Sequence, residues 1–256
     1  MSNKTAWRTT LLERQRWLVF LLPFLVFMLI GTLEPTPDEP GGKALGLAIP
    51  YAFYPWLYTI KIALTLAAMV FVLPGYREFP LRVTLLGLIV GAVGGPLWIV
   101  LCNLDFEHTY LLPLLEKVGL GWFIGSGARA AFNPFEQLAG QPAWAGAFLA
   151  VRFLGLVAVV PLIEELFLRG FLMRFVVERD WWNVPFGKVN KLAIALGTIV
   201  PMMMHPGELL AAAVWFSMIT WLMLRTRNLW DCVAAHALTN LILGLYVVWT
   251  GAWRLM

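Results

Sequence analysis

The stretch FLAVRFLGLVAVVPLIEELFLRGFLM, residues 148–173, decides how this chain folds. It is mostly apolar and longer than the roughly 20 residues that a helix needs to cross a bilayer core, yet it contains Glu164, Glu165 and Arg169. A charged side chain at membrane depth costs about 2.5–3.5 kcal/mol even on insertion scales, and charges that occur there usually pair and mark a functional site. We therefore interpret these three residues as a site inside a membrane helix.

The composition of the whole chain indicates the same class of protein. It is 60% hydrophobic and 13% charged over 256 residues, whereas an average soluble domain is about 45–50% apolar and about 25% charged. We predict an all-α, polytopic transmembrane helical bundle that forms a single integral membrane domain over residues 1–256. A net charge of +4 would suggest a nucleic-acid partner for a soluble protein. In a membrane protein, basic residues mostly set topology, so we expect the lipid bilayer and no nucleic acid.

Hydropathy predicts about seven spans, or eight if Lys43–Tyr54 is partly embedded. The connection Asp105–Pro142 is expected to hold an interfacial helix or a lid. Basic residues of the N-terminal segment and of alternate loops fall on one side of a seven-span arrangement, which places the N-terminus in the cytoplasm by the positive-inside rule. The predicted spans are Trp17–Leu33, Tyr54–Leu73, Leu81–Cys102, Ala143–Val177, Leu192–Met204, Glu208–Leu224 and Leu229–Trp249.

Polar residues of three separate segments fall at a similar predicted depth. At 1.5 Å of rise per helical residue, Glu164, His205, His236 and Asn240 lie roughly 14–21 Å from the nearest basic residues that mark the cytoplasmic interface. The chain has only three histidines, and two of them belong to this set. We therefore predict one polar cluster, built from three helical arms inside the bilayer.

Local spacing supports this cluster. His236 and Asn240 are four residues apart and share a helix face, and so do Glu165 and Arg169. Arg169 can therefore neutralise Glu165, while Glu164, rotated by roughly 100°, points elsewhere and is available for chemistry. Pro206-Gly207 ends the helix directly after His205. Such a break at membrane depth is tolerated where protein or a wet cavity covers the backbone.

These side chains suffice for hydrolysis of a peptide bond. A carboxylate in a poorly solvated pocket can take a proton from water and return it to a leaving group. Histidine and amide side chains can donate hydrogen bonds to the oxyanion of a tetrahedral intermediate. Two His and one Glu could instead bind Zn²⁺, although no HExxH motif is present. We expect no cofactor and no metal, with a metallopeptidase as the open alternative.

Three motifs resemble the CAAX protease and bacteriocin-processing (CPBP, or Abi) family of intramembrane endopeptidases, which includes the type II CAAX prenyl proteases. The family pattern is EExxxR, FxxxH and HxxxN or HxxxD. Here it reads EELFLR at 164–169, PMMMH at 201–205 and HALTN at 236–240. Pro201 therefore replaces the usual Phe. The resemblance covers roughly residues 143–246, which we expect to be the catalytic core.

The resemblance implies a role for each motif residue. Glu164 would activate the water with help from His205, His236 and Asn240 would form the oxyanion hole, and Glu165 with Arg169 would support the site. Within the family, the bacterial subset encoded near exosortase sorting systems is similar in its HPGE (205–208) and RTRNLWDCVAAHALTN (225–240) stretches. The expected location is a bacterial inner membrane, and the expected substrate is a membrane-associated protein or peptide. Oligomeric state is not readable from the sequence.

Two other classes of function compete with an enzyme. A non-catalytic scaffold or immunity protein could bind a peptide in the same cavity. A transporter is less favoured, because the polar residues form one set and we see no second polar set in the other spans. Replacing Glu164 by Gln separates these hypotheses, since it removes the base and keeps the side chain's volume.

Overall fold

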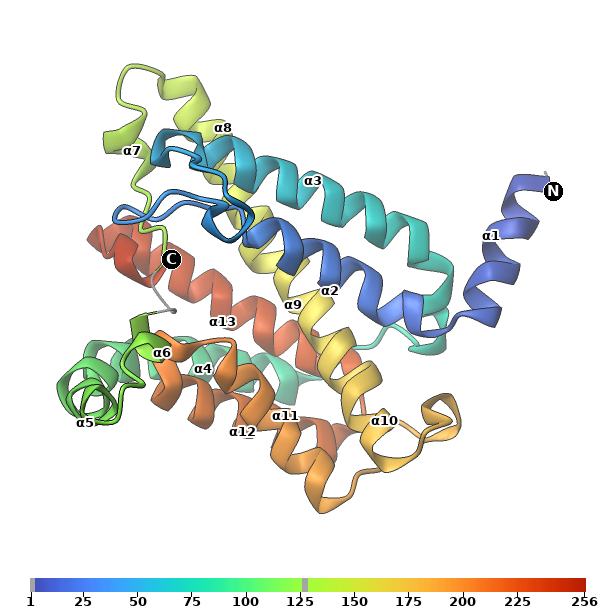
Figure 1. Ribbon diagram of the computed structural model, residues 1–256. Coiled ribbons are helices and arrows are strands. Elements are labelled where there is room, and N and C mark those ends of the chain that lie inside the picture. The colour runs from blue at the N-terminus through green and yellow to red at the C-terminus, as the bar shows by residue number, and fades with distance from the viewer. Residues whose placement is uncertain (1–2, 126–128) are drawn as a thin grey trace.

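The computed structural model, which describes residues 3–125 and 129–256, is a bundle of helices (Figure 1). Within those ranges the only β-type pairing is an isolated antiparallel bridge between Gly41 and Ile49. The predicted all-α class is therefore confirmed. The α-helices are α1 (Asn3–Arg14), α2 (Trp17–Gly31), α3 (Tyr54–Val72), α4 (Leu85–Asn103), α5 (Leu112–Lys117), α6 (Trp122–Gly125), α7 (Pro134–Gln137), α8 (Pro142–Leu154), α9 (Val160–Glu165), α10 (Met173–Val177), α11 (Lys191–Met203), α12 (Leu209–Thr226) and α13 (Leu229–Thr250).

Shorter turns connect or interrupt these helices. The π-helical segments are η4 (Glu107–Leu111), η5 (Gly155–Val159) and η6 (Leu166–Leu172). The 3₁₀ turns are η1 (Lys43–Leu45), η2 (Tyr51–Phe53), η3 (Leu73–Glu78), η7 (Trp181–Asn183), η8 (Pro206–Glu208) and η9 (Trp253–Leu255).

Five helical runs in the described residues are long and apolar enough to cross a membrane, and six if α1 and α2, which meet at 93°, count as one. The predicted count of seven to eight is therefore not confirmed. At 13 residues, α11 is roughly 20 Å long, which is short for a hydrocarbon core of about 30 Å. The region Lys43–Tyr54 forms two 3₁₀ turns before α3 begins. The five runs are Tyr51–Glu78, Leu85–Lys117, Pro142–Val177, Pro206–Thr226 and Leu229–Thr250.

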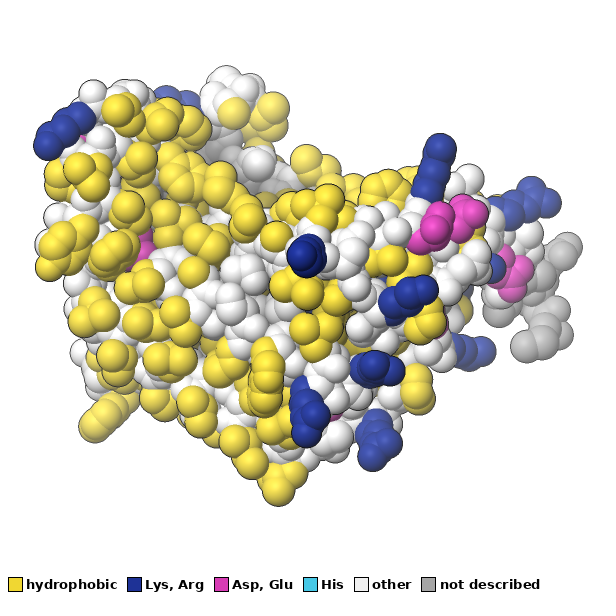
Figure 2. All heavy atoms as spheres, turned by 90° about the horizontal axis from the view of Figure 1, so that it is seen from below, with side chains coloured by type: hydrophobic (Ala, Val, Ile, Leu, Met, Phe, Trp, Pro, Cys, Tyr) yellow, Lys and Arg dark blue, Asp and Glu magenta, His cyan; other side chains and the backbone are white. Residues whose placement is uncertain are grey.

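The surface of the bundle suits a bilayer. Figure 2 shows one face covered largely by hydrophobic side chains, with most Lys and Arg side chains gathered toward one end. Large apolar side chains such as Leu29, Val70 and Trp249 are more than 60% exposed, which is unfavourable in water and favourable in lipid. With five candidate spans, these features identify an integral membrane protein.

The run Pro142–Val177 passes through the middle of the bundle as α8, η5, α9, η6 and α10 (yellow in Figure 1). Glu164 and Glu165 end the short helix α9, which lies between two π-helical segments. Pro161 near the start of α9 lacks the N–H that would continue the α-helical hydrogen bonding, and wider turns of this kind are frequent at functional sites. Both acids face the interior, with 7% and 0% exposure respectively.

Glycines of α4 let α13 approach closely. A Cβ atom at Gly91 would lie 2.7 Å from the carbonyl oxygen of Ala235, and one at Gly94 would lie 2.6 Å from Oγ1 of Thr239. Small residues at membrane helix contacts allow such close backbone approach. Because Ala235 and Thr239 flank His236 on α13, this contact fixes the position of the histidine.

Candidate active site

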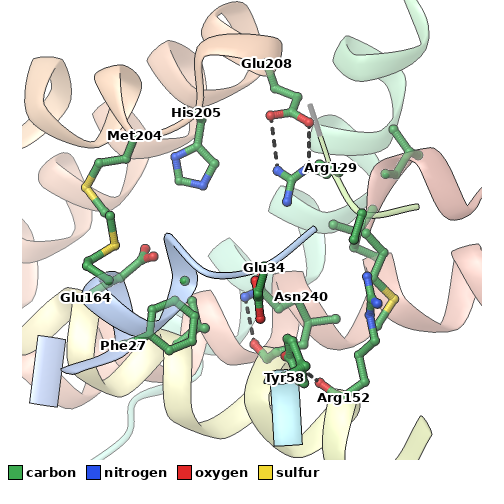
Figure 3. A pocket seen from close by; sticks show the side chains of 18 of the residues that line it. Phe27, Glu34, Tyr58, Arg129, Arg152, Glu164, Met204, His205, Glu208 and Asn240 are labelled. Carbon is green, nitrogen blue, oxygen red and sulfur yellow. Dashed lines mark hydrogen bonds and ion pairs between the residues drawn. The ribbon is translucent and has the colours of Figure 1, made fainter. Parts of the chain in front are cut away.

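A cavity of about 560 Å³ lies inside the bundle and is bounded by residues of α2, α3, α8, α9, α12 and α13 (Figure 3). Glu164, His205, His236 and Asn240 all line it. The structure therefore brings together the four residues that the sequence placed on three separate arms. Figure 3 shows Glu164 and His205 approaching the open space from different elements.

His236 lies between the two adjacent acids. Its Nδ1 atom is 3.0 Å from Oε1 of Glu165, and its Nε2 atom is 4.0 Å from Oε2 of Glu164. Glu165 is fully buried, whereas Glu164 lines the cavity with its Oε2 atom buried and without a hydrogen-bond partner. The two carboxylates thus hold one imidazole ring from both sides, and only Glu164 lines the cavity.

Arg169 is the partner of Glu165, one helical turn away. Its Nη1 atom donates to Oε1 of Glu165 at 3.4 Å. Its Nε atom is 3.2 Å from Oε2, within ion-pair range, but the two atoms are not aligned as a hydrogen bond. We therefore regard this pair as mainly electrostatic. The Nη2 atom donates to the carbonyl oxygens of Gly197 and Phe216, both at 3.4 Å, so that Arg169 joins the central run to α11 and α12.

His205 is held by its own backbone turn. Its Nδ1 atom lies 2.8 Å from the carbonyl oxygen of Pro201, so Nδ1 carries the proton and donates. In the neutral ring Nε2 is then an acceptor. The ring centroid lies 5.7 Å from that of Trp98 and 5.6 Å from that of Phe216. Pro201, which replaces the Phe of the family pattern, therefore contributes a backbone carbonyl that orients this histidine.

Asn240 forms a hydrogen bond to the π-helical segment η5. Its Nδ2 atom donates to the carbonyl oxygen of Leu156 at 2.8 Å. A helix that widens at η5 has carbonyl groups whose usual partners are shifted, and the amide uses one of them. One N–H and the amide oxygen of Asn240 remain for a bound molecule.

Aromatic rings complete the wall behind His236. The ring of Trp215 lies 4.6 Å from that of His236, centroid to centroid, and Phe216 lies 6.3 Å away. The Nε1 atom of Trp215 donates to Oγ1 of Thr239 at 3.1 Å, and Thr239 in turn donates to the carbonyl oxygen of Gly91 at 3.2 Å. This chain of bonds connects the histidine wall to the α4 contact.

The cavity also has a second polar set, and the sequence-based expectation that none exists is wrong. Lys61 pairs with Glu34 at 2.8 Å, and Arg129 pairs with Glu208 at 2.7 Å. Arg152 lines the same cavity. Lys61 and Arg152 each stand alone among apolar neighbours in the sequence, and a lone charge in a predicted span was the signal that would have found them. With this set present, the earlier argument against a transporter no longer holds.

In the part of the chain that the structure describes, no group of three or more His, Cys, Asp or Glu side chains is arranged to hold a metal ion. His205 and Glu164 approach the cavity from different elements (Figure 3), whereas Nε2 of His236 lies 4.0 Å from Oε2 of Glu164.

The comparisons with known proteins agree with the motifs. Residues 146–242 match the family described as Type II CAAX prenyl endopeptidase Rce1-like. The matched segment begins in α8 and ends in α13, and it contains Glu164, His205, His236 and Asn240. The comparisons with curated proteins and with solved structures found no match.

Proposed function

We propose, from the membership of this chain in the CAAX protease family through residues 146–242, that it cleaves a peptide bond inside the membrane with a glutamate-activated water. The family indicates intramembrane protease activity, and the apolar helices suit a substrate that is itself membrane-associated. The residues that perform the reaction and the substrate are our proposal.

One observation carries the proposal. Glu164 presents a buried carboxylate oxygen that lacks a hydrogen-bond partner and lines a cavity shared with both histidines. Leaving a buried acceptor unsatisfied costs about 1–3 kcal/mol, and more when it is charged. The other carboxylate oxygen of Glu164, Oε1, is not among the buried atoms and is the one that a water molecule in the cavity can reach. A water that donates to it would make the contact that a general base needs.

Glu164 can carry both proton transfers that hydrolysis of the peptide bond requires. Glu164 takes a proton from the water as its oxygen attacks the substrate carbonyl carbon, which gives a tetrahedral intermediate with a negative oxygen. The proton passes from Glu164 to the amide nitrogen, the C–N bond breaks, and a carboxylic acid and an amine leave. His205, with an accepting Nε2, assists by orienting the water.

His236 and Asn240 are proposed to stabilise the oxyanion. His236 can donate to an oxyanion through Nε2 while it also donates to Glu165 only if both ring nitrogens carry protons. Asn240 donates with the N–H that Leu156 does not use. Glu165 and Arg169 hold the imidazole in place, as outer partners of a catalytic histidine do.

Purified protein tests this mechanism directly. A panel of membrane proteins and peptides is incubated with the wild type, Glu164→Gln, His205→Ala and His236→Ala in liposomes, each with and without a chelator. We expect each substitution to lower cleavage by about 10²–10⁴-fold, with the chelator leaving the wild type active. Loss of activity with chelator that zinc restores would instead establish a metallopeptidase.

A binding protein is the second candidate, favoured by the size of the cavity and by its second polar set. Such a scaffold or immunity protein would hold a peptide without cutting it. A Glu164→Gln variant that keeps the full cellular role would establish this candidate and contradict the enzyme. The similarity to the exosortase-associated subset, the bacterial inner membrane and the cytoplasmic N-terminus stay predictions.

A further inference from the structure

Arg152 is a buried cation without a carboxylate partner. Its side chain is 3% exposed and lines the cavity, and its Nη1 atom has no hydrogen-bond partner. Among residues 3–125 and 129–256, no Asp or Glu lies within ion-pair distance of its guanidinium. Figure 3 shows this residue at the end of the cavity away from Glu164.

The neighbouring cations of the cavity differ from Arg152 in this respect. Lys61 has Glu34 at 2.8 Å, and Arg129 has Glu208 at 2.7 Å. Arg152 is held by two aromatic rings, with its Cζ atom 5.3 Å from the Tyr54 ring centroid and 5.6 Å from that of Tyr58. Lys61 contacts the same Tyr58 ring at 4.6 Å.

Two cations, Lys61 and Arg152, and one acid, Glu34, therefore lie around Tyr58. Among the side chains that the structure describes, Arg152 is the one of these three without an ion-pair partner. Isolated charges within a membrane are costly and by default mark a functional site. The tyrosine rings attract the cation, but they accept none of the hydrogen bonds that a planar guanidinium offers to a carboxylate. The missing partner is an anion with at least one oxygen acceptor.

We propose that Arg152 binds a carboxylate of the peptide that occupies the cavity, either the chain end or an Asp or Glu side chain. This inference rests on the proposed function, because it assigns a substrate contact within the same cavity. Arg152 precedes Glu164 by twelve residues of one helical run, or roughly 18 Å. An extended peptide advances about 3.3 Å per residue, so about five residues would connect the two backbone positions. Arg152 is thus a binding residue remote from the bond that breaks.

Binding to three peptide libraries tests this inference without requiring hydrolysis. The Glu164→Gln protein in phosphatidylcholine nanodiscs is offered N-palmitoylated random pentapeptides that lack acidic residues, first with a free C-terminus and then with an amidated one. A third library is amidated and contains one Glu. Bound peptides are counted by mass spectrometry. We expect a free-terminus or Glu library to bind roughly 10- to 100-fold better than the amidated neutral library, and the better library identifies the source of the carboxylate.

Substitutions of Arg152 decide whether it is the anchor. Arg152→Gln should remove the preference among the libraries, and Arg152→Met, which leaves no buried polar group, provides a second variant if the first does not fold. Arg254→Gln makes the same change of charge at an exposed residue outside the cavity and should keep the preference. Equal binding of the three libraries, or a preference that survives both Arg152 variants, would overturn the proposal.

Different results would contradict the peptidase proposal and the carboxylate-binding role of Arg152. Cleavage that depends on Glu164 but shows no carboxylate preference would contradict the role of Arg152 and leave the peptidase intact. A preference that depends on Arg152, in a protein that cleaves nothing in any library, would support the binding residue and favour the non-catalytic candidate.

Discussion

Two adjacent acids have different surroundings. Glu165 is fully buried and pairs with both Arg169 and His236, whereas Glu164 lines the cavity and, among the described residues, pairs only with His236, at 4.0 Å. The rotation of roughly 100° between successive helical residues separates them, so that Glu165 can support the site and Glu164 can act in it. Their different surroundings support the two different roles that we propose for these neighbouring acids.

The Glu165→Gln variant should unfold at a lower temperature than the wild type. It leaves the guanidinium of Arg169 buried without its carboxylate, and loss of one partner of a buried pair costs about 3–5 kcal/mol. The double variant Glu165→Gln with Arg169→Met should recover most of that loss. Thermal unfolding in detergent measures both, and a single variant as stable as the wild type would contradict this account.

A matched control is the exposed pair of Lys43 and Glu39, which has the same spacing of four residues and a distance of 3.3 Å. Exposed pairs contribute little to stability. Glu39→Gln should therefore leave the unfolding temperature almost unchanged, which separates the effect of burial from that of pairing.

Sequence reasoning predicted four residues that line one cavity in the structure, but it did not predict the rest of the cavity's lining. Glu164, His205 and His236 were visible because polar residues are rare in apolar segments. Arg152 was missed because its segment was interpreted as apolar apart from the acids and Arg169. Helix packing decides which oxygen of Glu164 lacks a hydrogen-bond partner and which nitrogen of His205 bonds to the carbonyl of Pro201. The periodicity of the sequence does not contain that information.

At the scale of elements, the contact between α4 and α13 positions His236. Gly91→Ala should destabilise the protein by about 1–3 kcal/mol, because the new Cβ atom would lie 2.7 Å from the backbone oxygen of Ala235. It should also lower cleavage by shifting His236. Denaturant unfolding and cleavage rates check both effects.

Gly146→Ala is the control for this prediction. Gly146 lies within helix α8 and is exposed, with nothing within 4 Å of an added Cβ atom. Since alanine is favoured over glycine in a helix by about 1 kcal/mol, this variant should be neutral or more stable. Two alanine variants of equal stability would show that the α4 contact is not tight.

The number of membrane spans is the part of the fold that hydropathy predicted least well. Apolar composition identified each of the five long runs, but it also counted Leu192–Met204, whose helix α11 has only 13 residues. Hydropathy does not report the 93° bend between α1 and α2 or the π-helical segments around α9. Of these features, only the π-helical segment before α9 adjoins a proline, Pro161.

At the scale of the whole molecule, basic residues gather at one end (Figure 2). Arg82, Arg174 and Arg227, which are far apart in the sequence, line one surface pocket. In Figure 1 the N-terminus lies toward one end of the bundle and the C-terminus toward the other. The positive-inside rule therefore predicts a cytoplasmic N-terminus and a C-terminus across the membrane.

Reporter fusions at each end measure this topology. A reporter active only in the cytoplasm should work at the N-terminus and fail at the C-terminus. Reporters active at both ends would place the termini on one side and contradict the predicted orientation.

Hydrolysis that depends on Glu164 is the central claim. The most direct measurement compares the new protein N-termini in membranes of cells that express the wild type or Glu164→Gln at equal abundance, identified by terminal labelling and mass spectrometry. We predict termini close to hydrophobic segments that occur with the wild type and disappear with Glu164→Gln. The same set of termini in both samples, with the cellular role intact in the variant, would contradict the claim.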